Sequence, residues 1–172
     1  MGDTFRSDLI ALLPRLHRFA LALSTDRDRA DDLVQAACER ALTRRAQWQP
    51  GTQLDSWMFT ILRNLWIDQL RARPREVVLD DDALEALPDD RDWNREIEAQ
   101  MSLDRVLAVM RELSPALRSV LGLVCVDGRS YKEAAEALGV PIGTVMSRLS
   151  RGRMELLRRL GTPQGVGHDA TV

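Results

Sequence analysis

Residues 130–160 carry the pattern that most constrains this chain, two helices joined by a tight turn. Ser130 and Glu133 have the spacing of a capping box, in which each side chain satisfies a backbone N–H at the start of a helix. Gly139 suits the end of that helix, because glycine adopts a positive φ without steric cost. Pro141 fixes its own φ and can only precede or open the next helix. The segment therefore predicts a helix-turn-helix.

The second of these helices has an apolar side and a basic side. The apolar side follows the helical period and comprises Val145, Leu149, Gly152, Leu156 and Leu160. The other side comprises Thr144, Ser147, Arg148, Arg151 and Arg158. Between positions 141 and 161, five arginines stand against one glutamate. A basic helical face is often merely solvated. In combination with the cap and the glycine turn, however, it favours contact with the DNA major groove, where arginine bonds guanine bidentately.

Charge is distributed unevenly, although the 172-residue chain has a net charge of only −2. Residues 1–73 contain 11 Arg and 9 acidic residues, a net charge of +2. Residues 74–100 contain 3 Arg and 10 acidic residues, a net charge of −7. Residues 101–172 contain 10 basic and 7 acidic residues, a net charge of +3. Two mildly basic segments therefore flank an acidic connector, which the net charge of the whole chain conceals.

Several classes of protein are disfavoured by composition. No apolar run approaches the roughly 18 residues of a membrane span, and the N-terminal residues lack the apolar stretch of a signal peptide. Cys38 and Cys125 are too few and too far apart for a disulfide framework or a zinc site. We therefore expect a cytoplasmic protein with no membrane insertion, no cofactor and no metal.

Helical periods dominate the chain, and runs with the two-residue period of strands are absent, so we expect an all-α fold. The first helix is predicted over about residues 5–24, with a kink or a restart at Pro14. The second is predicted over about residues 27–46, capped by Thr25 or Asp26. Both carry an apolar side, as helices packed in a small bundle do.

A third helix is predicted over residues 54–73, after a turn-rich loop in which Thr52 and Asp55 resemble a second capping box. Besides its core stripe, this helix has an aromatic and basic stripe that comprises Phe59, Arg63, Trp66, Leu70 and Arg73. A polar stripe comprises Thr60, Asn64, Asp68 and Arg71. A central place in a helical bundle explains two apolar stripes. Polar residues near an exposed Trp48 would also suit single-stranded nucleic acid, whose bases stack on aromatic rings.

The second half of the chain begins with an acidic, proline-containing stretch that predicts a flexible linker. Helices resume near Trp93, and Ser114 then caps a helix with Pro115 in its first position. That helix is predicted to end at Asp127 and Gly128. The expected organisation is a domain over residues 1–73, a linker over 74–92, a helix-turn-helix domain over 93–161 and a disordered tail over 162–172.

Taken together, two basic helical modules, an acidic linker and a terminal helix-turn-helix resemble a bacterial RNA polymerase sigma factor of the extracytoplasmic-function (ECF) group. In the first module the resemblance is carried by DRADDLVQAACERAL (residues 28–42) and SWMFTILRNLWIDQLRAR (residues 56–73). In the second it is carried by LSPALRSVLGLVCVDGRSYKEAAEALGVPIGTVMSRLSRGR (residues 113–153). The resemblance implies binding to the β′ subunit and β flap of core RNA polymerase. It also implies promoter-specific initiation through melting of the −10 element and reading of the −35 element.

The same resemblance assigns roles to three sets of residues. The β′-binding surface would comprise Asp31, Asp32, Leu33, Val34, Gln35 and Glu39. The −10 strand would be contacted by Trp48, Asn64, Asp68 and Arg71. The major groove of the −35 element would face Thr144, Ser147, Arg148 and Arg151. The chain departs from the family pattern at Met146, where many members carry lysine, and at Ala36 and Ala37, which replace polar or acidic residues.

The resemblance further implies control by an anti-sigma factor and a role in a stress response. A stand-alone helix-turn-helix regulator is the main alternative, although the sequence has no heptad seam for the dimer that such proteins usually form. An enzyme is not expected, because His17 and His168 are the only histidines and no metal-binding or phosphate-binding motif accompanies them.

Overall fold

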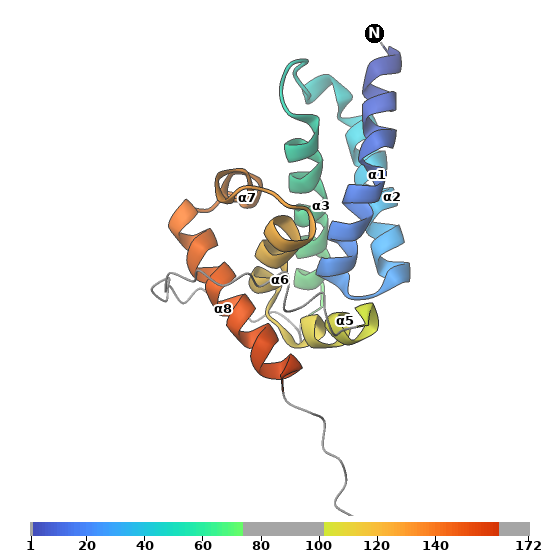
Figure 1. The fold of residues 1–172 in the computed structure, drawn as a ribbon. Helices are drawn as coiled ribbons and strands as arrows, with labels where there is room; N and C mark the ends of the chain where they lie inside the picture. The colour runs from blue at the N-terminus through green and yellow to red at the C-terminus, as the bar shows by residue number, and fades with distance from the viewer. Residues whose placement is uncertain (1, 74–101, 162–172) are drawn as a thin grey trace, which may run out of the picture.

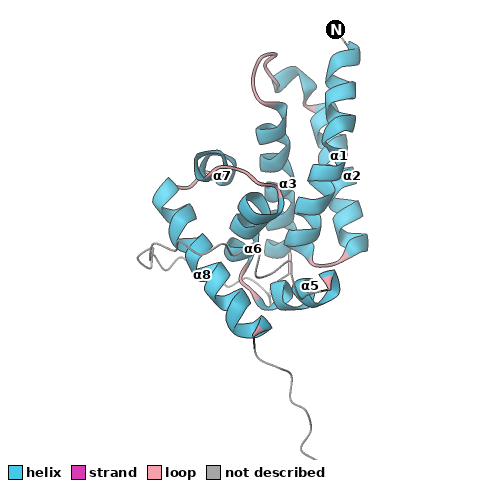
Figure 2. Cartoon of the chain, viewed as in Figure 1, coloured by secondary structure: helices cyan, strands magenta, loops and turns pink. Residues whose placement is uncertain are grey.

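The computed structural model describes residues 2–73 and 102–161 (Figure 1). All regular elements within these two ranges are helical, so the expected all-α class is confirmed (Figure 2). The predicted linker over residues 74–92, the start of the helix expected near Trp93 and the predicted tail over 162–172 lie outside the described residues.

Three helices form the first module, α1 (Gly2–Ser24), α2 (Arg27–Thr43) and α3 (Leu54–Arg71). α1 is a single helix that passes through Pro14, so the chain does not restart there. Asp26 caps α2 by accepting a hydrogen bond from the backbone N–H of Arg29 at 3.0 Å. Thr25 has a positive φ of 55° and turns the chain between α1 and α2 instead. A single 3₁₀ turn, η1 (Arg45–Gln47), follows α2.

The second capping box, expected from Thr52 and Asp55, is absent. α3 begins after Gln53, whose side chain makes no capping hydrogen bond. The hydroxyl of Thr52 donates to the carbonyl of Gln49 at 2.7 Å and closes the loop. The carboxylate of Asp55 instead forms an ion pair with Arg129 of the second module. The carboxylate that would have closed a local capping box is thus bound by Arg129, a charged residue from a distant part of the chain.

The second module comprises α5 (Leu103–Glu112), α6 (Pro115–Leu121), α7 (Tyr131–Leu138) and α8 (Ile142–Leu160). Ser114 caps α6 and Pro115 occupies its first position, as the sequence predicts. α6 continues into a π-helical turn, η2 (Gly122–Val126), and the helical run ends at Asp127 as expected.

The two modules pack directly against each other (Figure 1), with α6 and η2 against α1, and α7 against α3. A single cluster of buried apolar side chains extends through both modules. Gly122 lies close to α1, because a Cβ added there would lie 2.9 Å from Cδ2 of Phe19 and 3.2 Å from Cβ of Ala22. The absence of a side chain at Gly122 therefore allows the second module to pack closely against α1.

We predict that Gly122→Ala destabilises the protein by about 1–3 kcal/mol, because an added methyl group in a tightly packed interior forces its neighbours apart. Chemical denaturation measures this change in the free energy of unfolding. Gly143→Ala is the matched control, since nothing lies within 4 Å of a Cβ added at that position of α8. It is expected to be neutral or to stabilise by up to about 1 kcal/mol through helix propensity. Equal effects of the two substitutions would contradict the close contact at Phe19.

Candidate nucleic-acid interface

The helix-turn-helix is present as α7, a turn and α8. The backbone N–H of Ser130 donates to the carboxylate of Glu133 at 2.9 Å, and the N–H of Glu133 donates to the hydroxyl of Ser130 at 3.2 Å. The hydrogen bond from the Ser130 backbone N–H, and then the Ser130 hydroxyl, hold the pKa of the Glu133 carboxyl below its usual range. Gly139 ends α7 in the left-handed region at φ 64°, and Pro141 precedes the first residue of α8. The predicted capping box, glycine turn and second helix are therefore confirmed.

α8 buries one side and presents the other. All five apolar positions predicted for its inner side are buried, namely Val145, Leu149, Gly152, Leu156 and Leu160. The four residues predicted to face the −35 element are half-buried, namely Thr144, Ser147, Arg148 and Arg151. Arg158 is exposed, and its guanidinium donates to Glu155 at 2.8 and 3.1 Å. The polar residues in the N-terminal half of α8 are thus partly accessible, and the one exposed arginine of this helix lies near its C-terminal end.

Arg148 is half-buried and lies on a different flank of α8 from the exposed Met146 and Met154. Burial and then the nearby positive charge of Arg148 lower the pKa of Arg63 in α3. The positive charge of Arg148 in the second module therefore acts on a side chain of the first module.

The aromatic stripe of α3 lies in the contact between the modules. Phe59 packs edge-on against Phe19, with 5.2 Å between ring centroids, and the guanidinium of Arg129 lies 4.6 Å from the Phe59 centroid. Arg118 of α6 lies 5.3 Å from the centroid of Trp66. Of the two interpretations of this helix, the one that places α3 between neighbours is confirmed. Its aromatic rings are covered by arginines of the second module.

The polar stripe of α3 is mostly accessible. Asn64, Asp68 and Arg71, three of the residues predicted to contact the −10 strand, are exposed. Thr60 is partly covered, because its hydroxyl lies 2.9 Å from the carbonyl of Ser56 and 3.3 Å from the carbonyl of Ala137 in α7. The second module thus reaches the N-terminal end of this stripe and leaves the rest open.

Trp48, the fourth residue predicted to contact the −10 strand, is half-buried rather than exposed on its loop. Its ring centroid lies 5.3 Å from that of Phe5, and the guanidinium of Arg45 lies 5.3 Å from the Phe5 centroid. The indole N–H is buried without a hydrogen-bond partner among the described residues. A depression of about 870 Å³ between α1 and the loop is lined by Trp48, Phe5 and the segment Pro50–Asp55. The ring is therefore an anchor for this loop.

The residues predicted to bind β′ lie on two sides of α2. Asp31, Asp32, Gln35 and Glu39 are exposed, and Val34 is half-buried. Leu33 is only 1% exposed and packs in the core. It stabilises the helix that carries the exposed residues, and its own side chain is not accessible to a partner in this arrangement. Two of the exposed residues have partners on the surface. Asp31 lies 2.8 Å from Nε2 of His17, and Gln35 donates to Glu39 at 3.1 Å.

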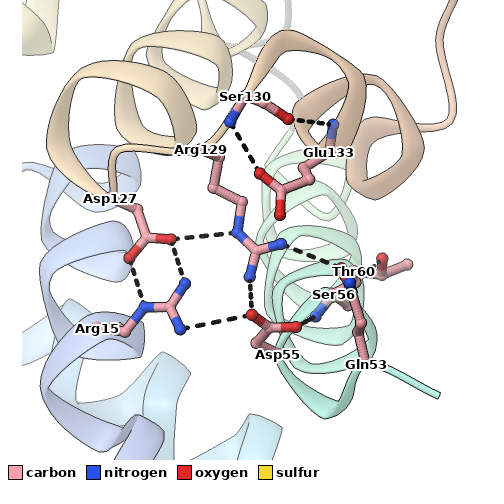
Figure 3. Close-up of polar contacts among 9 residues, drawn as sticks. All are labelled: Arg15, Gln53, Asp55, Ser56, Thr60, Asp127, Arg129, Ser130 and Glu133. Atoms are coloured by element: carbon pink, nitrogen blue, oxygen red, sulfur yellow. Dashed lines mark hydrogen bonds and ion pairs between the residues drawn. The ribbon is translucent and has the colours of Figure 1, made fainter. Parts of the chain in front are cut away.

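Sequence reasoning missed the charged cluster that joins the two modules (Figure 3), which comprises Arg15, Asp55, Asp127 and Arg129. The carboxylate of Asp127 is fully buried and accepts hydrogen bonds from Arg15 at 2.9 and 3.0 Å and from Arg129 at 3.2 Å. Arg129, 4% exposed, also lies 2.6 Å from Asp55, an ion pair whose angle is not that of a hydrogen bond. Two arginines and two carboxylates thus neutralise one another where α1, α3 and the loop before α7 meet.

Two further arginines of the second module bind the C-terminal end of α1. Arg118 donates to the carbonyl of Leu23 at 2.8 Å, and Arg111 donates to the carbonyl of Thr25 at 3.2 Å. Carbonyl groups at a helix C-terminus lack partners within the helix and carry partial negative charge, so cations are favoured there. Arginines therefore bridge the two modules both at the charged cluster and at the C-terminal end of α1.

We predict that Arg129→Met weakens the contact between the modules by about 1–3 kcal/mol, the usual contribution of hydrogen bonds to charged groups. Asp127 would remain bonded to Arg15, so each module should keep its helices while the two modules separate more readily. Small-angle X-ray scattering measures the separation, and circular dichroism measures the retained helicity. Arg158→Met, which removes an exposed pair within α8, is the control and should leave the scattering profile unchanged. An equally compact Arg129→Met variant would contradict the prediction.

No helix in the described ranges is long and apolar enough to cross a membrane. Among the same residues, no group of three or more His, Cys, Asp or Glu side chains is arranged to hold a metal ion.

Comparison with known families accounts for both modules. Residues 9–76 match the family described as Sigma-70 region 2, and residues 103–156 match the family described as Sigma-70, region 4. These two modules, in this order, define the class of sigma-70 RNA polymerase sigma factors. The second match includes α7, the turn and most of α8.

Comparison with individual relatives shows which group of sigma-70 factors the chain belongs to. The ECF RNA polymerase sigma factor EcfG of Rhodopseudomonas palustris (strain TIE-1) is 38% identical over 180 residues, which span 100% of this chain and 94% of that protein. The sigma factor RpoE from Bartonella quintana, solved in complex with the anti-sigma factor NepR, has a TM-score of 0.73 at 33% identity. That match covers 94% of this chain and 99% of RpoE. CnrH, solved in complex with the cytosolic domain of CnrY, shares the fold with a TM-score of 0.69 at 24% identity. The chain belongs to the ECF group of RNA polymerase sigma factors.

Proposed function

As an ECF sigma factor, the chain acts in transcription initiation, and we propose how its two modules divide that work. The first module binds the β′ subunit of core polymerase through the exposed residues of α2 and opens the −10 element beside the polar stripe of α3. The second module rests on the β flap and reads the −35 duplex with the N-terminal half of α8. The helix-turn-helix itself, with its capping box, its left-handed glycine turn and the buried inner side of α8, is the observation that supports this most directly. In this role the chain is cytoplasmic and itself carries out no enzymatic step.

The modules have to separate before both promoter elements are bound. Elements centred near −35 and −10 are about 25 base pairs apart, or roughly 85 Å of B-DNA at 3.4 Å per base pair. In the packed arrangement, however, α7 touches α3, with 3.3 Å between the Thr60 hydroxyl and the Ala137 carbonyl. One chain cannot span the promoter in that state. Initiation therefore requires the charged cluster to open.

An anti-sigma factor controls the chain in this proposal, and a stress response is the setting. The solved structures of RpoE and CnrH are complexes, with NepR and with the cytosolic domain of CnrY respectively. An inhibitor of this kind would act by covering the surfaces that polymerase needs.

Reconstituted transcription tests the proposed function. The purified chain is added to bacterial core RNA polymerase with a library of promoter fragments, and the run-off products are sequenced. Initiation that depends on the chain and enriches two elements supports the proposal. If initiation fails while the chain alone binds duplex DNA sharply, a stand-alone helix-turn-helix regulator is the better description.

Asn64→Ala tests the −10 role, because the side chain is exposed and its removal should not disturb packing. We expect normal duplex binding by the holoenzyme and promoter opening reduced about 3- to 10-fold, as the loss of one or two hydrogen bonds predicts. Permanganate footprinting measures the opened thymines. Gln69→Ala, exposed on α3 outside the polar stripe, is the matched control. Normal melting by Asn64→Ala would remove Asn64 from the −10 site.

Arg148→Ala tests the −35 role of the arginine on the flank of α8. If Arg148 bonds a base edge bidentately after the modules open, the variant should lose about 1–3 kcal/mol of discrimination at one position. Competition binding of the holoenzyme to single-base promoter variants measures this discrimination. A uniform loss across all sequences would instead assign Arg148 to phosphate, and an unchanged preference would exclude it from the interface.

A further inference from the structure

Two apolar side chains are exposed at the start of α8, on the flank of the helix that adjoins Ser147 and is turned away from Arg148. Ile142 is 49% exposed and Met146 is 43% exposed, and the two lie one helical turn apart. The core positions of this part of the helix are filled by Val145 and Leu149, which are buried. Packing within the protein therefore does not account for an apolar residue at position 146.

The chemistry of methionine limits what Met146 can contact. Its side chain has no charge and no hydrogen-bond donor, and its thioether is only a weak acceptor. Met146 therefore cannot hold a phosphate or bond a purine edge bidentately, as lysine or arginine would. What remains is apolar contact, and in the major groove the C5 methyl group of thymine is the apolar feature of the base edges.

The setting of Met146 points to DNA as the occupant of this face. Residues near the N-terminus of the second helix of a helix-turn-helix reach the base edges. Met146 lies in the second turn of α8 and directly precedes Ser147. The segment from 141 to 161 carries five arginines and one glutamate, a charge that suits a polyanion rather than an apolar protein surface.

We propose that Met146 is a specificity-determining residue that contacts the C5 methyl group of a thymine in the −35 duplex. The proposal rests on the proposed reading of that duplex by α8 and adds the base that this side chain selects. It predicts that a thymine is required at one position of the −35 element because of its methyl group, and that the requirement disappears with the Met146 side chain.

The test first needs the preferred −35 sequence. Holoenzyme reconstituted from core polymerase and the full chain is used to select from promoters randomised over the −35 element. The same selection is made with Met146→Ala. Each thymine of the selected element is then replaced in turn by deoxyuridine, which removes only the methyl group, and the affinities are compared by competition.

For the wild-type chain, one deoxyuridine substitution should weaken binding about fourfold, the factor expected for one methyl group removed from contact. Met146→Ala should no longer select that thymine and should bind the thymine and deoxyuridine duplexes equally. Met154→Ala is the matched control, because Met154 is also exposed on α8, at 54%, but lies two turns further from its N-terminus. This control should retain the wild-type preference and the wild-type loss with deoxyuridine.

The possible outcomes separate this proposal from the function on which it rests. If wild-type holoenzyme selects no −35 sequence, the reading role of α8 fails and the proposal fails with it. If a sequence is selected but deoxyuridine has no effect, or has the same effect on Met146→Ala, only the role of Met146 is overturned. Weaker binding of Met146→Ala to core polymerase without a change in base preference would assign the side chain to a protein contact, which also overturns the proposal. Because Met146 is exposed, its loss should leave the helicity measured by circular dichroism unchanged.

Discussion

The buried carboxylate of Asp127 is the group on which the arrangement of the two modules depends. A fully buried charge costs several kcal/mol unless it is paired, and Asp127 is paired only where Arg15 of α1 and Arg129 of the second module meet around it. Because buried ion pairs add little net stability over their solvated state, such a cluster fixes the geometry of the contact without making it strong. Once the modules separate, water solvates the same four charges. The packed arrangement is thus well defined and still able to open.

Opening changes what α3 presents to its surroundings. In the packed arrangement, the guanidinium groups of Arg129 and Arg118 lie over Phe59 and Trp66. Separation of the modules would remove this cover, whereas Asn64 and Asp68 lie on the other side of α3 and are already exposed in the packed arrangement. The central place of α3 in the packed bundle is therefore confirmed, and its contact with unpaired bases stays a prediction.

Local patterns in the sequence predict the helix-turn-helix well, because each determinant acts within a few residues. The bonds between Ser130 and Glu133 span three positions, and the buried side of α8 follows from the helical period alone. The charged cluster was not predictable in this way, because the bond between Arg15 and Asp127 spans 112 positions. Asp55 shows how a distant contact can override a local pattern. Its spacing from Thr52 predicts a capping box, but its carboxylate forms an ion pair with Arg129 of the second module. Leu33 does not belong on the predicted β′-binding surface for a simpler reason. The prediction covers a contiguous stretch of sequence, whereas a helix turns every third or fourth of its residues inward, and Leu33 is one of these.

The packed arrangement contains a repulsion between Arg63 and Arg148 as well as the attraction within the charged cluster. Two guanidinium groups that lie close together repel each other, and here the repulsion acts across the contact between the modules, between α3 and α8. Separation would relieve this repulsion, whereas the charged cluster favours contact. Under the proposed function, promoter phosphates that attract both arginines would shift the balance toward the open state. Salt screens the half-buried Arg63 and Arg148 more than the fully buried Asp127, so high ionic strength is expected to favour the packed arrangement both by screening the repulsion and by weakening the attraction to DNA.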